Sequence, residues 1–269
     1  MKTCLTIAGS DASGGAGIQA DLKTFAAHGI YGMSVIVAVV AENTCEVRSV
    51  MDVSPQVIRD QIDCVMTDIP PDAVKIGMLS SQASMQAVAD GLAAHRPKNV
   101  VIDPVMLAKD GSELMAPEAL TLFKTGILPH ATVFTPNIPE AEVLTGMTIR
   151  TEEDMRKAAK ILLDMGAQTV LVKGGHLEGE AIDILDDGQS VHRFESARIQ
   201  TKNTHGTGCT LSSAIASNLA KGYDLETAVR RAKAYISGAL AAMLDLGHGS
   251  GPMNHAFALD NEWSKEAEA

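Results

Sequence analysis

Two glycine-containing turns hold the residues most able to do chemistry. The first, Gly9-Ser10-Asp11-Ala12-Ser13-Gly14-Gly15-Ala16-Gly17, follows an apolar segment and precedes a helix-like one. Its glycines let the backbone approach a ligand closely, and amides at the start of a helix favour polar or anionic ligands. It is not a Walker loop, because no Gly-Lys-Ser/Thr closes it. The alternative is a flexible connection that binds nothing.

The same segment contains a weak match to a dinucleotide-binding fingerprint. Gly15-x-Gly17-x-x-Ala20 has the small residues that the fingerprint needs, and Glu42 lies about where an acid would bind the ribose. The fingerprint should begin at the end of its strand, however, whereas Gly15 comes seven residues after Ala8. A nicotinamide-dependent oxidoreductase is therefore only an alternative.

The second turn is Thr204-His205-Gly206-Thr207-Gly208-Cys209-Thr210, which precedes a helix of small residues. Consecutive amides at Gly206, Thr207 and Gly208 would form an anion site suited to the charge on a transferring phosphoryl group. Cys209 would lie in the first helical turn, where the helix dipole lowers the pKa of a thiol, so we expect a usable base. The alternatives are an ordinary helix start with a structural cysteine, and a bracing role for His205.

Charged and polar side chains follow three further apolar segments. Asp103 comes directly after one, Asn137 and Glu140 follow the next, and Lys173 ends a third. Two carboxylates at neighbouring strand ends suit Mg²⁺, which takes few protein oxygens, and a lysine there can meet a phosphate. The alternatives are a helix cap formed by Asn137 and Glu140, and an exposed strand-end lysine.

The composition excludes several classes of partner. The chain has 22 basic and 33 acidic residues, a net charge of −11, and 3% aromatic residues. We therefore expect no nucleic-acid binding and no membrane association. The four cysteines are scattered and the eight histidines show no metal-ligand spacing, which disfavours disulfides and a zinc site. With no secretory signal pattern and no membrane-length apolar run, we expect a cytoplasmic protein.

Short apolar segments alternate with amphipathic helical patterns along the whole chain. Most apolar segments are continuous, as in strands that are covered on both faces. Strands are predicted at residues 3–8, 33–41, 73–76, 100–102, 132–135, 169–172 and 181–185. Helices are predicted at residues 18–28, 55–68, 81–95, 117–126, 139–145, 152–165, 210–221 and 225–244. This alternation predicts an α/β fold with helices on both faces of a mainly parallel sheet.

No linker, repeat or long charge run divides the chain. We therefore expect a single domain over residues 1–269, with a loosely packed tail at about residues 256–269. In sheets of this kind, ligands bind beyond the carboxyl ends of the strands. Both glycine turns follow or face such ends, so we expect them to converge at one rim.

Several further motifs occur in a fixed order with the two turns. They are Tyr31-Gly32-Met33, Lys75-Ile76-Gly77-Met78-Leu79, Val101-Ile102-Asp103-Pro104-Val105, Thr135-Pro136-Asn137-x-x-Glu140-Ala141 and Gly247-His248-Gly249-Ser250-Gly251-Pro252-x-Asn254-His255. Together they closely resemble the hydroxymethylpyrimidine/phosphomethylpyrimidine kinases of thiamine biosynthesis, within the ribokinase-like superfamily. The resemblance covers roughly residues 3–255.

The resemblance implies a ribokinase-like three-layer fold, a homodimer, and ATP with Mg²⁺. It implies phosphorylation of 4-amino-5-hydroxymethyl-2-methylpyrimidine to its monophosphate and then to its diphosphate. The anion hole would be formed by Gly206, Thr207 and Gly208, with Cys209 as the base. The other implied roles are a substrate pocket of Asp21, Glu42, Ala16, Val40, Met78 and Val105, a nucleotide side with Lys173, Lys233 and Asn137, and metal binding by Asp103 and Glu140.

One position departs from the family pattern. Related kinases usually carry Gln in Ala-Gln-Asn-Thr, whereas this chain has Ala41-Glu42-Asn43-Thr44. An ionised Glu only accepts hydrogen bonds, so either the aminopyrimidine is protonated on its ring nitrogen or Glu42 is itself neutral, and we expect the protonated ring. The nearest alternative is a pyridoxine/pyridoxal kinase, because close relatives accept vitamin B6 rings. A non-catalytic nucleotide or vitamin sensor is a third alternative, which the intact turn around Cys209 disfavours.

Overall fold

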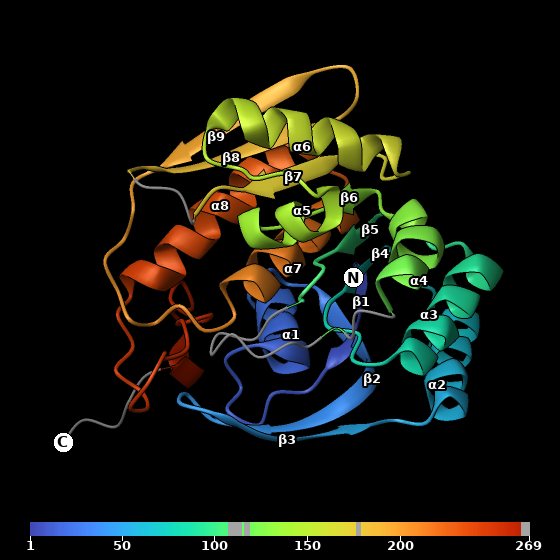
Figure 1. The fold of residues 1–269 in the computed structure, drawn as a ribbon. Helices are drawn as coiled ribbons and strands as arrows, with labels where there is room; N and C mark the ends of the chain where they lie inside the picture. Colours follow the sequence, from blue (N-terminus) through green and yellow to red (C-terminus); the bar gives the residue numbers. More distant parts are fainter. Residues whose placement is uncertain (107–114, 116–118, 176–178, 265–269) are drawn as a thin grey trace.

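A nine-stranded sheet forms the centre of the structure, a computed structural model that describes residues 1–106, 115, 119–175 and 179–264 (Figure 1). The strands are β1 (Thr3–Gly9), β2 (Tyr31–Glu42), β3 (Val47–Asp52), β4 (Ala73–Ile76), β5 (Val100–Ile102), β6 (Val133–Phe134), β7 (Val170–Lys173), β8 (Ala181–Asp186) and β9 (Val191–Ser196). Their order is β3-β2-β1-β4-β5-β6-β7-β8-β9. The six inner strands from β2 to β7 are parallel, and antiparallel pairing occurs only at the two edges. The predicted mainly parallel sheet is confirmed.

The inner strands are apolar because helices cover them on both faces. Every residue of β4 and β5 is buried, so neither strand shows the alternation of a half-exposed strand. The pattern does not predict β3 or β9. In β3 five of the six residues are exposed, and β9 alternates around the single buried residue Phe194, so neither has a continuous apolar run.

The helices form two layers, one on each face. The first layer contains α2 (Pro55–Asp68), α3 (Gln82–His95), α4 (Ala119–Leu122), α5 (Ile138–Thr145) and α6 (Glu152–Asp164). The second contains α1 (Gly17–Ala27), α7 (Thr207–Ala220) and α8 (Leu225–Ala241), and α1 lies beside α7 (Figure 1). A separate apolar core lies under each layer, with Ile62 and Leu162 in the first and Phe25 and Ile215 in the second. The predicted three-layer arrangement is therefore confirmed.

Three predicted helices differ from the structure by more than one residue, and one of them, α8, ends at Ala241 rather than at residue 244. Helix α7 begins at Thr207 rather than at residue 210, because Gly206 takes the left-handed conformation (φ 78°) just before the helix. In the predicted helix at 117–126, residues 117 and 118 lie outside the described residues. The remainder is α4 followed by a π-helical turn, Phe123–Ile127, and the 3₁₀ turn Leu128–His130.

The end of the chain is exposed where the structure describes it. Residues 256–264 all have exposed side chains, and Glu262–Ser264 forms a 3₁₀ turn. Residues 265–269 of the predicted tail lie outside the described residues. Among the described helices, none has both the length and the apolar character needed to cross a bilayer.

Candidate active site

The two glycine turns converge at the carboxyl edge of the sheet, as predicted. Their backbones are in close contact, because a Cβ on Gly206 would lie 1.9 Å from the carbonyl oxygen of Gly15. The side chain of His205 also joins them, with its Nε2 2.9 Å from Oδ2 of Asp11. The turns and the neighbouring strand ends line one cleft of about 440 Å³.

Asp11 fixes the shape of the first turn. Its carboxylate accepts hydrogen bonds from the amides of Ser13 (2.7 Å) and Ala16 (2.6 Å), in addition to its contact with His205. Burial alone would raise the pKa of Asp11, but these hydrogen bonds lower it to about 2. His205 therefore braces the two glycine turns against each other, as the alternative for this residue suggested. The sequence did not reveal that Asp11 is its partner.

The start of α7 lies at the cleft, and the amide of Thr207 makes only a long hydrogen bond (3.4 Å), to the carbonyl oxygen of Thr204. Gly206, Thr207 and Gly208 all line the cleft, and no side chain of the described residues caps this end of the helix. Gly208 lies close to Asp103, since an added Cβ would be 2.9 Å from Oδ2 of that carboxylate. A helix start without a capping side chain suits a bound anion.

Cys209 lies in the first turn of α7 and is only 9% exposed. Burial raises the pKa of its thiol to about 11. Lys75 and the amide of Gly17 oppose this rise, while the carboxylates of Asp21 and Asp103 add to it. The predicted lowering of the thiol pKa is therefore wrong, because desolvation outweighs the helix dipole at this position.

Asp103 and Lys173 form an ion pair between the ends of β5 and β7. Nζ of Lys173 lies 2.7 Å from Oδ1 of Asp103, and the two side chains are 13% and 3% exposed. Burial opposes the charge on Lys173, but the carboxylates of Asp103 and Glu140 raise its pKa above the ordinary value. Lys173 is thus held beside the cleft by a carboxylate, unlike the exposed strand-end lysine of the alternative.

Asn137 and Glu140 form a capping box at the start of α5. The amide of Asn137 donates to Oε2 of Glu140 (2.8 Å), and the amide of Glu140 donates to Oδ1 of Asn137 (2.9 Å). Burial raises the pKa of Glu140; Lys173 opposes the rise and Asp103 adds to it. Both residues also line the cleft, so a capping role and a ligand-binding role are compatible.

The residues at this end of the cleft fit a magnesium ion. Asp103 and Glu140 supply hard carboxylate oxygens, which Mg²⁺ prefers. Both carboxylates interact with the single ammonium group of Lys173, and a bound divalent cation would favour their ionised forms.

One other group of side chains that could bind a metal ion occurs among the described residues. It consists of Asp11, Glu42 and His205, whose ligand atoms lie within 4.8 Å of one another. Two of its members, Asp11 and His205, make the contact that joins the two turns, and Glu42 lies beside them.

Most of the predicted acceptor pocket is assembled in the same cleft. The predicted residues that line it are Ala16, Val40, Glu42, Met78 and Val105. Residues 43–46, at the tip of the hairpin between β2 and β3, line it too and were not predicted as site residues. Asn43 and Thr44 belong to the motif Ala41-Glu42-Asn43-Thr44, and this link to Glu42 is the sequence signal that could have suggested them.

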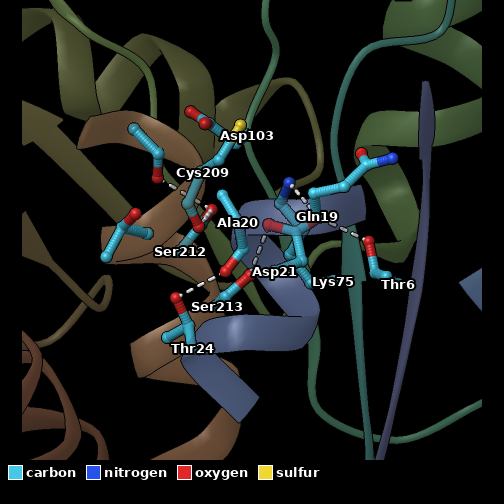
Figure 2. Close-up of polar contacts among 12 residues, drawn as sticks. Thr6, Gln19, Ala20, Asp21, Thr24, Lys75, Asp103, Cys209, Ser212 and Ser213 are labelled. Carbon is cyan, nitrogen blue, oxygen red and sulfur yellow. Dashed lines mark hydrogen bonds and ion pairs between the residues drawn. The ribbon is translucent and has the colours of Figure 1, made fainter. Parts of the chain in front are cut away.

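Asp21, predicted to contact substrate, does not line the cleft. It is fully buried on α1 and accepts hydrogen bonds from Thr6 (2.6 Å), Ser213 (2.7 Å) and Lys75 (2.8 Å) (Figure 2). These partners come from β1, α7 and β4, so Asp21 lies where these three elements meet α1. Lys75 is fully buried too, and its sequence signals are a charge inside an apolar strand and its place in the motif Lys75-Ile76-Gly77-Met78-Leu79.

Lys233, predicted on the nucleotide side, does not line the cleft either. Its Nζ lies 2.5 Å from Oδ2 of Asp183. The other oxygen of Asp183 accepts a hydrogen bond from the amide of Gly174 (2.9 Å), the residue after Lys173. Lys233 therefore supports the end of β7 from α8 and does not face a ligand in this cleft.

Comparison with known sequences agrees with this arrangement. The profile of the phosphomethylpyrimidine kinase family matches residues 11–254. The chain is 52% identical over 258 residues to a thiamine biosynthesis bifunctional protein of Geobacter sulfurreducens, which covers 96% of this chain and 53% of that protein. It is 50% identical over 255 residues to the hydroxymethylpyrimidine/phosphomethylpyrimidine kinase of Rhizobium meliloti, covering 93% of this chain and 96% of the relative. The chain thus spans about half the length of the first relative and nearly all of the second.

Comparison with solved structures agrees on the fold. The ADP complex of Bacillus subtilis pyridoxal kinase matches with a TM-score of 0.89 and 41% identity, covering 95% of this chain and 98% of that one. The predicted ribokinase-like fold is therefore confirmed. A family profile that matches most of the chain, together with identities of 50% and more, shows that the chain belongs to the phosphomethylpyrimidine kinase family.

Proposed function

We propose that this protein transfers the terminal phosphoryl group of ATP to 4-amino-5-hydroxymethyl-2-methylpyrimidine, and then to the resulting monophosphate, in thiamine biosynthesis. The observation that carries the proposal is the convergence of the two glycine turns beside Asp103 and Lys173 in one cleft. Membership in a family of kinases supports the reaction type, and the name of the Rhizobium meliloti relative supports the acceptor.

In this proposal, the amides of Gly206, Thr207 and Gly208 hold the phosphoryl group during transfer. Negative charge spreads over its oxygens in the transition state, and donors that the helix start has already oriented stabilise that charge without rearranging. Lys173 and Asn137 would contact the phosphates on the nucleotide side. Asp103 and Glu140 would hold Mg²⁺, which neutralises phosphate charge when bound.

The acceptor would lie between the hairpin side of the cleft and Cys209. Ala16, Val40, Met78 and Val105 would pack against the ring, and the carboxylate of Glu42 would accept from the protonated ring nitrogen and the exocyclic amine. Cys209 would take the proton of the acceptor hydroxyl. Asp21 would act only from behind, by holding α1 and α7 together.

ADP release tests the proposed function. We expect turnover with the aminopyrimidine and with its monophosphate, and much lower kcat/KM with pyridoxal. Stabilisation against heat by NAD but not by MgATP would favour the oxidoreductase alternative. Binding of MgATP and the aminopyrimidine without ADP release would favour a sensor. A homodimer, a single domain over residues 1–269 and a cytoplasmic location stay predictions.

Pyridoxal kinase is the second candidate function. It is favoured by the match to the Bacillus subtilis pyridoxal kinase, at a TM-score of 0.89. Equal or higher kcat/KM with pyridoxal than with the aminopyrimidine in the same assay would establish it.

Replacing Glu42 with Gln should change the pH dependence of KM for the aminopyrimidine. The wild-type carboxylate pairs with the protonated ring, so its KM should rise as the pH increases through the pKa of the ring. Gln pairs with the neutral ring, so the variant KM should instead rise as the pH falls. KM for ATP serves as the internal control, and superimposable KM profiles for the two proteins would contradict the pairing.

Replacing Gly206 with Ala should lower kcat/KM by about 10²–10³-fold, the cost of displacing one anion-hole donor. The new Cβ would lie 1.9 Å from the carbonyl oxygen of Gly15, at a residue whose φ is 78°. Gly222→Ala is the matched control, because Gly222 also has a positive φ (88°) but no atom near a new Cβ, and it follows the other end of α7. If both variants lose activity equally, backbone strain rather than the anion hole is responsible.

A further inference from the structure

The glycine-rich segment of residues 247–255, here called the strap, has no role in the chemistry described so far. It follows α8 and lies between two parts of the cleft that are far apart in sequence. One is the hairpin tip at residues 43–46, and the other is the anion-hole turn at residues 204–210. Figure 1 shows the red C-terminal segment beside the blue tip of the β2–β3 hairpin.

The strap is hydrogen-bonded to the hairpin tip at Thr44. Oγ1 of Thr44 accepts hydrogen bonds from the amides of His248 (3.2 Å) and Gly249 (3.1 Å), and its carbonyl oxygen accepts from the amide of Ser250 (2.9 Å). The approach is too close for a side chain on the strap, since a Cβ on Gly249 would lie 2.1 Å from the carbonyl oxygen of Thr44. Three donors on one residue define the position of the hairpin tip.

The same segment holds the anion-hole turn from its other side. The amide of His205 donates to the carbonyl oxygen of Gly251 (3.1 Å), and His205 and Pro252 form an isolated parallel β-bridge between the two segments. Nε2 of the buried His255 lies 2.9 Å from Oγ1 of Thr210, the residue after Cys209. The hydroxyl of Tyr235 on α8 donates to the carbonyl oxygen of His255 (2.6 Å), which fixes the far end of the strap.

We propose that the strap couples the acceptor side of the cleft to the anion hole, with Thr44 as the positioning residue through which it acts; this inference rests on the proposed function. Glu42 and residues 43–46 line the acceptor side, and the strap joins them to His205 and Thr210 on either side of the anion-hole amides. An acceptor that orders the hairpin tip therefore also orders the amides that receive the phosphoryl group. By linkage, a nucleotide held at those amides should tighten acceptor binding by the same factor.

Thr44→Val tests the coupling, because valine keeps the shape of threonine but cannot accept the two amide hydrogen bonds. The measurement is calorimetric titration of the full-length protein with Mg²⁺ and a non-hydrolysable ATP analogue, with and without the aminopyrimidine. We expect the aminopyrimidine to tighten binding of the analogue in the wild type, and this coupling factor to fall about tenfold in Thr44→Val. We also expect kcat to fall by a similar factor, while the affinity for the ATP analogue without the aminopyrimidine changes less than about twofold.

Two further variants separate coupling from simple misfolding. Thr44→Ser keeps the hydroxyl and should retain the wild-type coupling factor and kcat. Gly249→Ala, at a residue that does not itself line the cleft, forces the strap away from Thr44 and should reproduce the loss. Wild-type coupling in Thr44→Val, or equal losses in the Val and Ser variants, would overturn the strap inference.

Failure of the proposed function gives a different result. If the wild type turns over the aminopyrimidine and all three variants match it, the function stands and the strap inference is rejected. If the wild type does not bind the aminopyrimidine, the proposed function is rejected, and the same titrations with pyridoxal decide the strap inference. If neither ring is bound, both are rejected.

Discussion

Cys209→Ala should lower kcat by about 10²–10⁴-fold, the usual effect of removing a general base, with little change in KM for ATP. Cys209 lies in the first turn of α7, directly after the anion-hole glycines, and lines the cleft. An alcohol that attacks a phosphoryl group held by those amides would present its proton to this side chain. A cysteine can accept a proton only as its thiolate, so if Cys209 is the base its protonation state should appear in the kinetics.

The pH dependence of kcat follows from the raised pKa of this thiol. Burial places that pKa at about 11, so at pH 7 only about one molecule in 10⁴ carries the thiolate. Below the pKa the thiolate fraction rises tenfold per pH unit, so kcat of the wild type should increase towards alkaline pH while Cys209→Ala stays flat. Cys64→Ala, at an exposed cysteine on α2, is the control and should match the wild type. Near-normal turnover in Cys209→Ala, or a wild-type pH slope in that variant, would show that another group accepts the proton.

Lys75→Met should reduce the free energy of unfolding by about 3–5 kcal/mol, because it leaves the carboxylate of Asp21 buried without its cation. Both side chains of this pair are completely buried, and Nζ and Oδ2 are 2.8 Å apart. Asp21 also accepts from Thr6 and Ser213, so the loss should loosen the junction of β1, α1 and α7 (Figure 2). Denaturant unfolding monitored by circular dichroism measures the effect.

Two controls identify the cause of that loss. Lys2→Met breaks an ion pair with Asp72 of similar length, 2.7 Å, but at the surface, where we expect a change within about 1 kcal/mol. Adding Asp21→Asn to Lys75→Met removes the unpaired charge and should restore much of the stability. A double variant no more stable than Lys75→Met would mean that packing around Lys75, and not the charge of Asp21, causes the loss.

The sequence predicted the fold well where helices bury strands on both faces. Continuous apolar runs located β1, β4 and β5 within a residue at each end, because burial demands such runs. The edge strand β3 is exposed at five of its six positions and β9 at three of six, so no apolar run marks either strand. The π-helical turn after α4 is a departure in backbone hydrogen bonding that side-chain periodicity does not record.

The candidate site was predictable where strand ends and glycine turns define it. The topological rule that ligands bind beyond the carboxyl ends of the strands brought Asp103, Lys173 and the turns together correctly. The direction of each side chain was not predictable. The sequence therefore placed Asp21 and Lys233 at the site, whereas both side chains lie away from the cleft. The raised pKa of Cys209 was also missed, because burial depends on the packing of the whole chain.

The contact between Asp11 and His205 has a consequence for how the protein is made. These residues are separated by 194 positions, and Thr44 meets Gly249 across 205. During synthesis, β1, β2 and β4 can pair long before the residues that complete the cleft have left the ribosome. We expect stalled chains that end before the strap to bind neither nucleotide nor vitamin precursor, so that unfinished translation products do not sequester either metabolite.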